Sequence, residues 1–428
     1  MYTEAMDAQA YYAGKNIEIL RRLTYLQKHG LIDSKVKFHK ICSGFFPKLV
    51  KQLSQYLLGN GVTLPEGIKG KLGLRFDSTL QKMGIQALVD GVNWGFWNLN
   101  KLYVFRATEF VPLFDEGNGD LRAGIRFWRL APDKPLFVEL YEESGITKYD
   151  ESENETLAIR EEKMPYIYKI RTDGISSEII DTENYSKIPI FPLWANELKR
   201  SELTPGMKSM VDAYDFINSD LADSITLIEG VYWAIKNYGG DSVPELVKEM
   251  EAFRAIVTEH GDSSGSDATS HVIEIPYQAK QAALDIYRKL IYSDFMGLDM
   301  DSIKGGTLTN VAINVAKSDL DLKADLFEWQ CADFVHNLLN LIGVSDKVEA
   351  QFKRRSITND TEMITNIYMM RADLDHRTAL EINPVIPDIL VDIILDRFAK
   401  EQLGIDEDDD EEINEVIEDE EAANDGGG

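Results

Sequence analysis

The segment GLDMDSIKGGTLTNVAINVAKSDLDLKADLFEWQ, residues 297–330, contains the pattern that most suggests chemistry. The paired Gly305 and Gly306 precede a helical pattern, and glycines before a helix often hold a phosphate. A nucleotide-binding Walker loop, however, needs Lys followed by Ser or Thr after its last glycine. Here Lys304 precedes the glycines, Thr307 follows them directly, and the loop is entered from a helix rather than a strand. We therefore predict no nucleotide binding.

Other reactive residue types do not converge on a site. The acidic pairs Asp299/Asp301 and Asp319/Asp321 are of a kind that binds magnesium in nucleases, but such pairs arise by chance in a chain with 73 Asp and Glu. The six histidines form no HExxH motif, and no GxSxG motif occurs. We predict no catalytic residue, no metal site and no cofactor. A metal-dependent nuclease is the alternative enzyme function, and a magnesium-dependent plasmid-cutting assay would detect it.

The aromatic residues of NWGFWN, namely Trp94, Phe96 and Trp97, are of a type that stacks on nucleic-acid bases. Basic residues do not interleave with them, so we predict that they pack in the core instead.

The composition describes an acidic protein with enough apolar residues to fold. The 428 residues are 44% apolar and carry a formal net charge of −28, which repels nucleic acid and anionic membranes at long range. Acidic residues dominate after Asp406, whereas residues 1–60 are locally basic. The two cysteines are expected to be reduced thiols. The sequence shows no signal peptide and no apolar run of about 18 residues that would span a membrane, so we expect synthesis in the cytoplasm.

The order of expected elements divides the chain. Residues 1–98 are predicted to be mainly helical, with one helix running through Trp97, and residues 99–193 to form an antiparallel sheet region. A long helix over 205–229 begins with Thr204 as its cap and Pro205 at its first position. A small insert follows, with strands at VYWAIK and HVIEI and a surface loop at EHGDSSGSDATS. The remaining helices are expected at 277–297, 307–341, 360–382 and 386–403.

This order resembles the portal proteins of tailed bacteriophages, especially those of siphophages with long non-contractile tails. Local similarity is strongest over residues 188–340. The matching residues are Ile188-Pro189, Asn196-Glu197, Asp212, Tyr214, Ser219-Asp220 and the segment LDLKA at 320–324. The sequence departs from the family at Gly306-Thr307-Leu308, where the family more often has Ser-Gly before an Ala-Leu helix start.

The resemblance implies an α+β portal fold with a division into named parts. These are a wing over 1–204, β-rich at 99–193; a stem helix at 205–230; a clip at 231–276; a second stem helix at 277–297; a tunnel loop at 298–306; a long wing helix at 307–343; a crown at 344–404; and a disordered acidic tail at 405–428.

The resemblance also implies function and partners. About twelve subunits would form a ring at one capsid vertex of the virion, through which double-stranded DNA passes without sequence specificity during packaging and ejection. The implied protein partners are terminase, a head-completion or adaptor protein, and the major capsid and scaffolding proteins; no membrane is involved. Another head–tail connector or a minor capsid protein is the alternative within the same interaction class.

The resemblance directs attention to two sets of candidate DNA-channel residues. A pore must not bind DNA tightly, because each lysine–phosphate contact would retain the moving duplex. The acidic face of the first stem helix is therefore a candidate lining, although a solvated helix face is an equal alternative; it comprises Asp212, Asp215 and Asp223. The tunnel loop is expected to be polar, exposed and turned by its glycines, and to touch DNA weakly through Lys304. It comprises Leu298, Asp299, Met300, Asp301, Ser302, Ile303, Lys304, Gly305 and Gly306.

Overall fold

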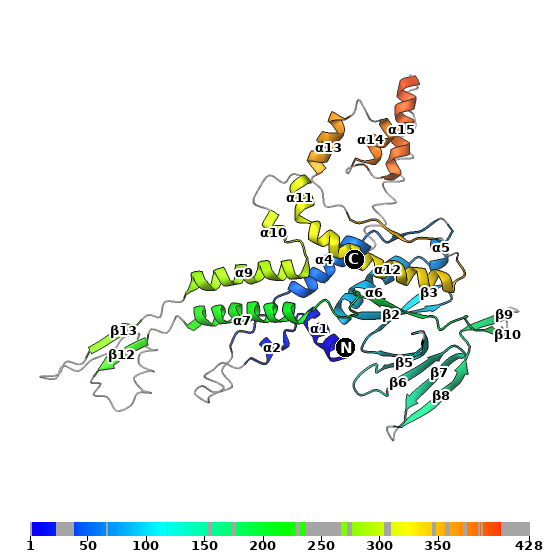
Figure 1. The fold of residues 1–428 in the computed structure, drawn as a ribbon, viewed down its shortest axis with the longest axis horizontal. Coiled ribbons are helices and arrows are strands. Elements are labelled where there is room, and N and C mark those ends of the chain that lie inside the picture. Colours follow the sequence, from blue (N-terminus) through cyan, green and yellow to red (C-terminus); the bar gives the residue numbers. More distant parts are fainter. Residues whose placement is uncertain are drawn as a thin grey trace. The chain divides into compact units, whose positions relative to one another are not determined.

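The structure is a computed structural model with helices and antiparallel strands in two compact units (Figure 1). One unit contains Met1–Asp299 and Asp319–Arg355, and the other contains Met300–Ser318 and Ser356–Gly428. The mixed helix-and-sheet content agrees with the predicted class. The structure describes residues 2–22, 38–65, 67–117, 119–152, 156–172, 177–227, 232–236, 267–271, 276–303, 310–344, 348–355, 360–370, 375–383, 386 and 388–403.

The N-terminal part of the first unit is helical, as predicted. Its helices are α1 (Tyr2–Tyr12), α2 (Ile17–Leu20), α4 (Phe45–Leu58), α5 (Lys69–Leu72) and α6 (Phe76–Asp90). Helix α4 has buried apolar residues at helical spacing, including Phe46, Leu49 and Leu53. Helices α4 and α6 pack against each other, and α1 packs against both.

Helix α6 ends earlier than predicted. Its cap, Gly91, has a φ of 90°, a left-handed conformation that favours glycine. The next residues form strand β2 (Val92–Asn98), so the predicted helix through Trp97 is wrong. Nearly every residue of β2 is buried, which removes the polar–apolar alternation that usually identifies a strand. Strand β2 pairs with β3 (Lys101–Arg106) and β11 (Ile190–Trp194) in an antiparallel sheet.

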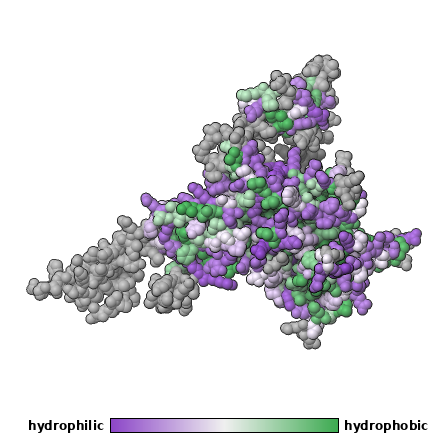
Figure 2. All heavy atoms as spheres, viewed as in Figure 1, coloured by the Kyte–Doolittle hydropathy of each residue, from purple (hydrophilic) through white to green (hydrophobic). Residues whose placement is uncertain are grey.

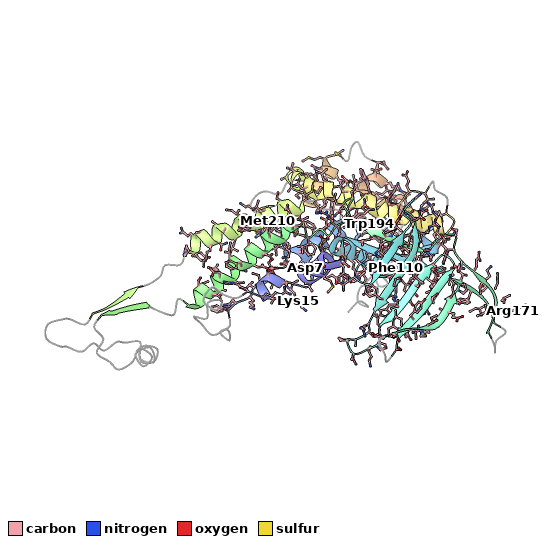
Figure 3. All side chains as sticks on the ribbon, turned by 60° about the horizontal axis from the view of Figure 1, so that its bottom comes forward. Asp7, Lys15, Phe110, Arg171, Trp194 and Met210 are labelled. Atoms are coloured by element: carbon pink, nitrogen blue, oxygen red, sulfur yellow. The ribbon has the colours of Figure 1, made fainter. Side chains whose placement is uncertain are left out.

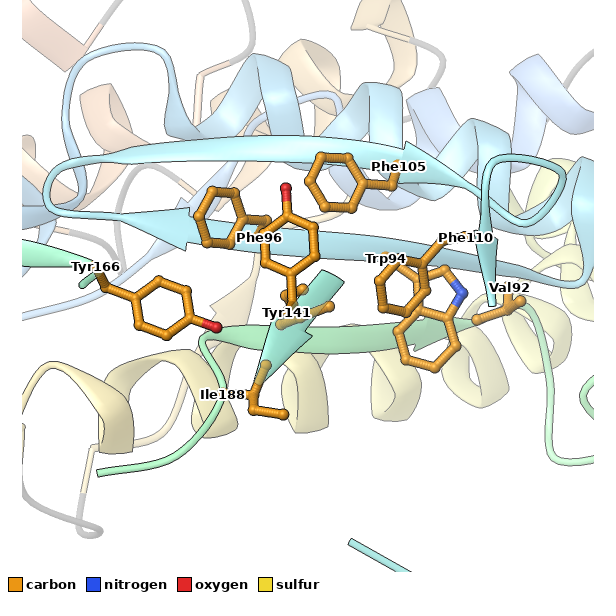
Figure 4. Close-up of a cluster of buried hydrophobic side chains, with 9 residues drawn as sticks. Val92, Trp94, Phe96, Phe105, Phe110, Tyr141, Tyr166 and Ile188 are labelled. Carbon is orange, nitrogen blue, oxygen red and sulfur yellow. The ribbon is translucent and has the colours of Figure 1, made fainter. Parts of the chain in front are cut away.

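The predicted packing role of the NWGFWN aromatics is confirmed. Trp94 and Trp97 are each 1% exposed. The Trp94 and Phe110 ring centroids lie 4.8 Å apart, and Trp94 belongs to the aromatic cluster in Figure 4. Between the two tryptophans, a Cβ at Gly95 would lie 2.7 Å from Cζ of Phe334. Glycine at this position therefore lets β2 pack directly against the helix that contains Phe334.

The predicted antiparallel sheet region is confirmed. A five-stranded sheet has the strand order β4 (Phe110–Phe114), β5 (Leu121–Trp128), β6 (Phe137–Glu142), β7 (Gly145–Glu151) and β8 (Leu157–Met164). A hairpin follows, made of β9 (Ile167–Thr172) and β10 (Ser177–Glu183). In Figure 3, Phe110 lies where the sheet meets the core, and Arg171 marks the hairpin.

The predicted long helix over 307–343 is two helices, α11 (Asn310–Ala316) and α12 (Ser318–Leu341), which belong to different units. Alternating β-branched residues in α11 restrict side-chain rotamers and lower helix propensity near the break. Helix α12 buries an apolar stripe that includes Phe327, Cys331 and Phe334. After α12, β14 (Gln351–Phe352) pairs with β1 (Val62–Thr63).

The described part of the second unit is helical. Its elements are α10 (Met300–Ile303), α11, α13 (Asp360–Met369), α14 (His376–Glu381) and α15 (Asp388–Leu403). A single helix over 360–382 was predicted, but α13 and α14 are separate. Asp375 caps α14, since its Oδ2 accepts from Thr378 N at 3.3 Å; such a cap starts a new helix. The acidic tail at 405–428 lies outside the described residues.

Candidate functional site

Helix α7 (Pro205–Leu227) begins as the sequence predicts. The Oγ1 atom of Thr204 accepts from Met207 N at 3.1 Å, and the Thr204 carbonyl accepts from Lys208 N at 2.8 Å. Proline at the first helical position loses no intrahelical hydrogen bond. The start of this helix is therefore fixed by residues readable in the sequence.

Helix α9 (Tyr277–Phe295) packs beside α7 (Figures 1 and 3). Lys280 of α9 donates to Asp220 Oδ2 at 2.7 Å and to Ser224 Oγ at 2.8 Å, both on α7. Leu284 and Ile291 are buried apolar residues of α9. The two helices thus form a packed pair that is linked by polar contacts.

The carboxylates predicted to form a solvated or channel-lining face of α7 contact the N-terminal segment instead. Asp215 is 0% exposed, and its oxygens accept from Ser43 N at 2.8 Å and Asn16 Nδ2 at 2.8 Å. Asp223 is 7% exposed and accepts from the backbone amide of His39 at 2.7 Å. The expectation of solvent exposure is therefore wrong for these two residues.

Asp212, the third predicted lining residue, lies near the same N-terminal segment. Its Oδ1 accepts a short hydrogen bond from the Tyr11 hydroxyl, and its Oδ2 lies 3.3 Å from Lys208 Nζ. Burial raises the pKa of Tyr11, and the hydrogen bond to Asp212 raises it further. This hydroxyl therefore remains a neutral donor.

Helix α7 is largely covered, whereas α9 has a long open face. Among the α7 side chains described after the first turn, those of Ser209, Phe216 and Ile225 are exposed. Figure 2 shows apolar side chains among hydrophilic ones over α9, where Ile286 and Leu290 are 57% and 46% exposed. Further exposed residues of α9 are Tyr277, Gln278, Ala279, Gln281, Ala282, Asp285, Lys289, Ser293 and Asp294.

The end of α9 differs in detail from the predicted glycine stop. Met296 takes the left-handed conformation, with a φ of 60°, and Gly297 N donates to the Tyr292 carbonyl at 2.8 Å. This is the bonding of a Schellman cap. A Cβ at Gly297 would lie 2.4 Å from Cδ2 of Leu49, so glycine is needed for close packing against α4.

The beginning of the predicted loop 298–306 is anchored rather than exposed. Leu298 is 2% exposed, and its backbone N and O bond the Gln52 side chain at 3.0 and 2.9 Å. Asp299 Oδ1 pairs with Arg288 Nη2 at 2.7 Å, and its side chain is 15% exposed. The expectation of an exposed Asp299 is therefore wrong.

The rest of this segment is placed as follows. Met300, Asp301, Ser302 and Ile303 form α10, and Met300 and Asp301 are exposed. Lys304, Gly305 and Gly306 lie outside the described residues.

Sequence reasoning missed Gln52 and Arg288 as residues that hold this segment. Gln52 lies 246 positions before Leu298, so no local spacing links them. Arg288 lies 11 positions before Asp299, beyond the i,i+4 pairing of a helix. Only the folded arrangement of α4 and α9 reveals these contacts.

The insert between α7 and α9 is described only in part. Strand β12 (Tyr232–Lys236) confirms the predicted VYWAIK strand, and it pairs antiparallel with β13 (Asp267–His271). Residues 267–270 were predicted to be part of a loop, so that prediction is wrong. Residues 272–275, which make up most of the predicted HVIEI strand, lie outside the described residues.

One member of each acidic pair considered for metal binding contacts protein groups. Asp321 accepts from the Tyr56 hydroxyl and lies 3.3 Å from Arg354 Nη1, and Asp299 pairs with Arg288. Over the described ranges, no three or more His, Cys, Asp or Glu side chains are grouped to hold a metal ion. In the same ranges, no helix combines the length and apolarity needed to cross a bilayer.

Comparison with known proteins gives consistent results. A family model described as phage portal protein, SPP1 Gp6-like, matches residues 2–423. The portal protein of Clostridium phage phiCD119 is 24% identical over 399 residues, which cover 84% of this chain and 84% of that protein. The portal protein of Bacillus phage SPP1 is 23% identical over 412 residues, covering 88% and 80% respectively.

Among solved structures, the neck of an empty GTA particle is similar at a TM-score of 0.44 with 12% identity, covering 90% of this chain and 100% of that chain. The family model spans nearly the entire sequence, including the α7–α9 pair. The chain therefore belongs to the SPP1 Gp6-like family of phage portal proteins.

Proposed function

We propose that this chain is a portal subunit whose copies form a ring at one vertex of a phage capsid. Double-stranded DNA passes through the axial channel of the ring during packaging and ejection. The match of the portal family model to residues 2–423 carries this proposal. The net charge of −28 supports it, because an acidic protein does not hold the phosphate backbone.

The ring is tested on the purified full-length chain by native mass measurement and negative-stain imaging. We expect about twelve subunits around a hole wide enough for a DNA duplex. Monomers or dimers alone, at high concentration and with scaffolding protein present, would contradict the proposal. A ring without an axial hole would favour another connector or minor capsid component.

We further propose that α7 and α9 form the stem and that α9 presents its open face to the channel. The support is that α9 carries the solvent-exposed face, whereas Asp215 and Asp223 of α7 are occupied within the subunit. Acidic Asp285 and Asp294 on α9 would repel the DNA backbone. The open face of α9 is therefore the revised candidate for the channel lining, in place of the buried carboxylates of α7.

Gold labelling of a single engineered thiol distinguishes the two helices. Ser293→Cys on α9 and Ser209→Cys on α7 are matched variants, since both serines are exposed; each is made in a Cys42→Ser background. We expect the label within the central hole for Ser293→Cys and on the outer wall for Ser209→Cys. The reverse pattern would assign the channel face to α7.

We also propose that the segment 298–306 approaches DNA at its far end while its first residues stay anchored. The Gln52 and Arg288 contacts support the anchored start. One Lys304 per subunit would give weak, salt-sensitive phosphate contacts. We expect Lys304→Ala to reduce DNA packaging or retention without loss of rings, while the control Lys317→Ala retains both. Normal packaging and retention in Lys304→Ala would contradict this role.

The finer division into parts is also proposed. The insert 231–276 is the clip that binds terminase and the adaptor protein, and the C-terminal helices after residue 344 form the crown. Replacement of residues 260–266, which precede β13, is expected to weaken binding of these partners and leave the ring intact. Partner binding that survives replacement of the entire insert would place the docking surface elsewhere.

A further inference from the structure

Residues 38–44, here named the strap, run along α7 in the direction opposite to the helix. The backbone amides of alternate strap residues donate to side chains of α7. With each step of two residues along the strap, the acceptor lies one turn closer to the N-terminus of α7. The three bonds are His39 N to Asp223 Oδ1 (2.7 Å), Ile41 N to Ser219 Oγ (2.9 Å) and Ser43 N to Asp215 Oδ1 (2.8 Å).

The spacing of these bonds follows from backbone geometry. Two residues of extended chain advance about 6.7 Å, and four residues of α-helix advance about 6.0 Å, so amides and acceptors stay aligned over three bonds. The next α7 positions at this spacing are Val211 and Leu227, whose side chains accept no hydrogen bond. A shift of the helix by one turn would therefore lose a bond, and the side chains define one register.

The acceptors of these bonds are buried inside the subunit. Asp215 and Ser219 are 0% exposed and Asp223 is 7% exposed. Burial raises the pKa of Asp215, and hydrogen bonds from Ser43 and Asn16 act in the opposite direction. The strap amides thus take the place of water as hydrogen-bond donors to these acceptors. When the strap opens, water must hydrate the acceptors again.

The contact is also incompletely bonded. Within the described part of the chain, buried polar atoms with no hydrogen-bond partner include Arg22 Nη1 and Asp223 Oδ2. Arg22 Nη1 lies 3.7 Å from Asp223 Oδ2, too far for a hydrogen bond. Unmade bonds reduce the stability of the closed contact relative to its hydrated open form. Segments with such contacts open locally before a domain unfolds.

We propose that the strap is a reversible clasp that fixes the axial register of α7 and opens independently of the rest of the first unit. The strap leads directly into α4, and Phe45 at the start of α4 packs edge-on against Tyr214 of α7 with ring centroids 4.9 Å apart. Opening therefore frees one side of α7 while the α4 contact remains. The stem role of α7 rests on the proposed function; the clasp itself does not.

The two native thiols report clasp opening. Cys42 lies in the strap and is half-buried, whereas Cys331 is fully buried in α12. In full-length protein treated with Ellman's reagent, Cys42 reacts when the strap opens, and Cys331 reacts only on wider unfolding. We expect Ser219→Ala to accelerate Cys42 labelling roughly three- to tenfold, the effect of one lost hydrogen bond. Ser209→Ala, an exposed position on the same helix, is the control.

Hydrogen exchange measured by mass spectrometry tests whether the clasp holds α7. In Ser219→Ala, faster exchange is expected both in residues 38–44 and in the C-terminal half of α7. Unchanged Cys42 labelling, or labelling of Cys42 and Cys331 at one common rate in the wild type, would overturn the proposal. Faster exchange confined to 38–44 would overturn the register-fixing role. Ring formation is scored separately in the same samples, so failure of the clasp and failure of the portal function are distinguishable.

Discussion

Tyr56 connects three segments of the first unit through one side chain and its own backbone. Its hydroxyl donates a short hydrogen bond to Asp321 of α12, and its carbonyl accepts from Arg355 N at 3.0 Å. Burial, followed by the hydrogen bond to Asp321, raises the pKa of Tyr56 from 10.0 to about 12. The ionised form is therefore disfavoured in the folded protein but not in the unfolded chain.

This difference predicts an alkaline loss of stability. The stabilising contribution of the neutral Tyr56 hydroxyl is fully present below the unfolded pKa of 10.0 and is lost as pH rises through about 12. We expect the unfolding free energy of wild type to fall more steeply between these pH values than that of Tyr56→Phe. Denaturant titrations at several pH values measure the difference, and parallel curves would contradict the raised pKa.

A second residue-scale prediction concerns Gly297. A Cβ there would lie 2.4 Å from Leu49 Cδ2, whereas nothing lies within 4 Å of a Cβ at Gly44. We expect Gly297→Ala to destabilise the protein by roughly 1–3 kcal/mol through overpacking, and Gly44→Ala to have a much smaller effect. Chemical denaturation measures both variants. A combined effect of Gly297→Ala and Leu49→Ala that is smaller than the sum of the two single effects would identify the clash as the cause, and equal effects of the two glycine changes would exclude it.

At the scale of elements, the sequence predicted what local chemistry determines. Thr204 and Pro205 fixed the start of α7, and short runs of aromatic and β-branched residues broken by turn residues identified the antiparallel sheet. Predictions from the sequence were wrong where tertiary packing determines the structure. Strand β2 lost its alternation because both of its faces are buried. The carboxylates of α7 were assigned to solvent because the strap that covers them has no regular secondary structure and no periodicity in sequence. Gln52 was missed because its partner is 246 positions away.

Arg354 links the segment after α12 back to that helix. Its guanidinium lies within 3.3 Å of carboxylates one turn apart on α12, and these are Asp321, Asp325 and Glu328. Removing the cation leaves these acids facing one another. We expect Arg354→Met to lower the unfolding free energy by roughly 1–2 kcal/mol, and Arg377→Met, in a more exposed ion pair on α14, to lower it less. Thermal and denaturant unfolding compare the two, and equal losses would contradict a special role of the Arg354 cluster.

At the scale of the whole molecule, charge opposes the association that the proposed function requires. Each subunit carries −28, and like-charged copies in a ring repel one another over a Debye length of about 8–10 Å at physiological salt. Residues 406–428 contain 13 Asp and Glu and no Lys or Arg, so a chain ending at Gly404 carries −28 + 13 = −15. Assembly should therefore respond both to salt and to the tail.

We expect the fraction of wild-type subunits in rings to rise as NaCl increases from about 0.05 to about 0.5 M, because salt screens the repulsion between subunits. A chain truncated after Gly404 should form the same ring at lower salt. Sedimentation velocity across a salt series measures the ring fraction, and a tail with Gln in place of Asp and Glu separates charge from chain length. If rings instead dissociate as salt increases, ion pairs between subunits dominate assembly, and net repulsion does not govern it. If truncation abolishes the ring at every salt concentration, the tail contributes contacts rather than charge alone.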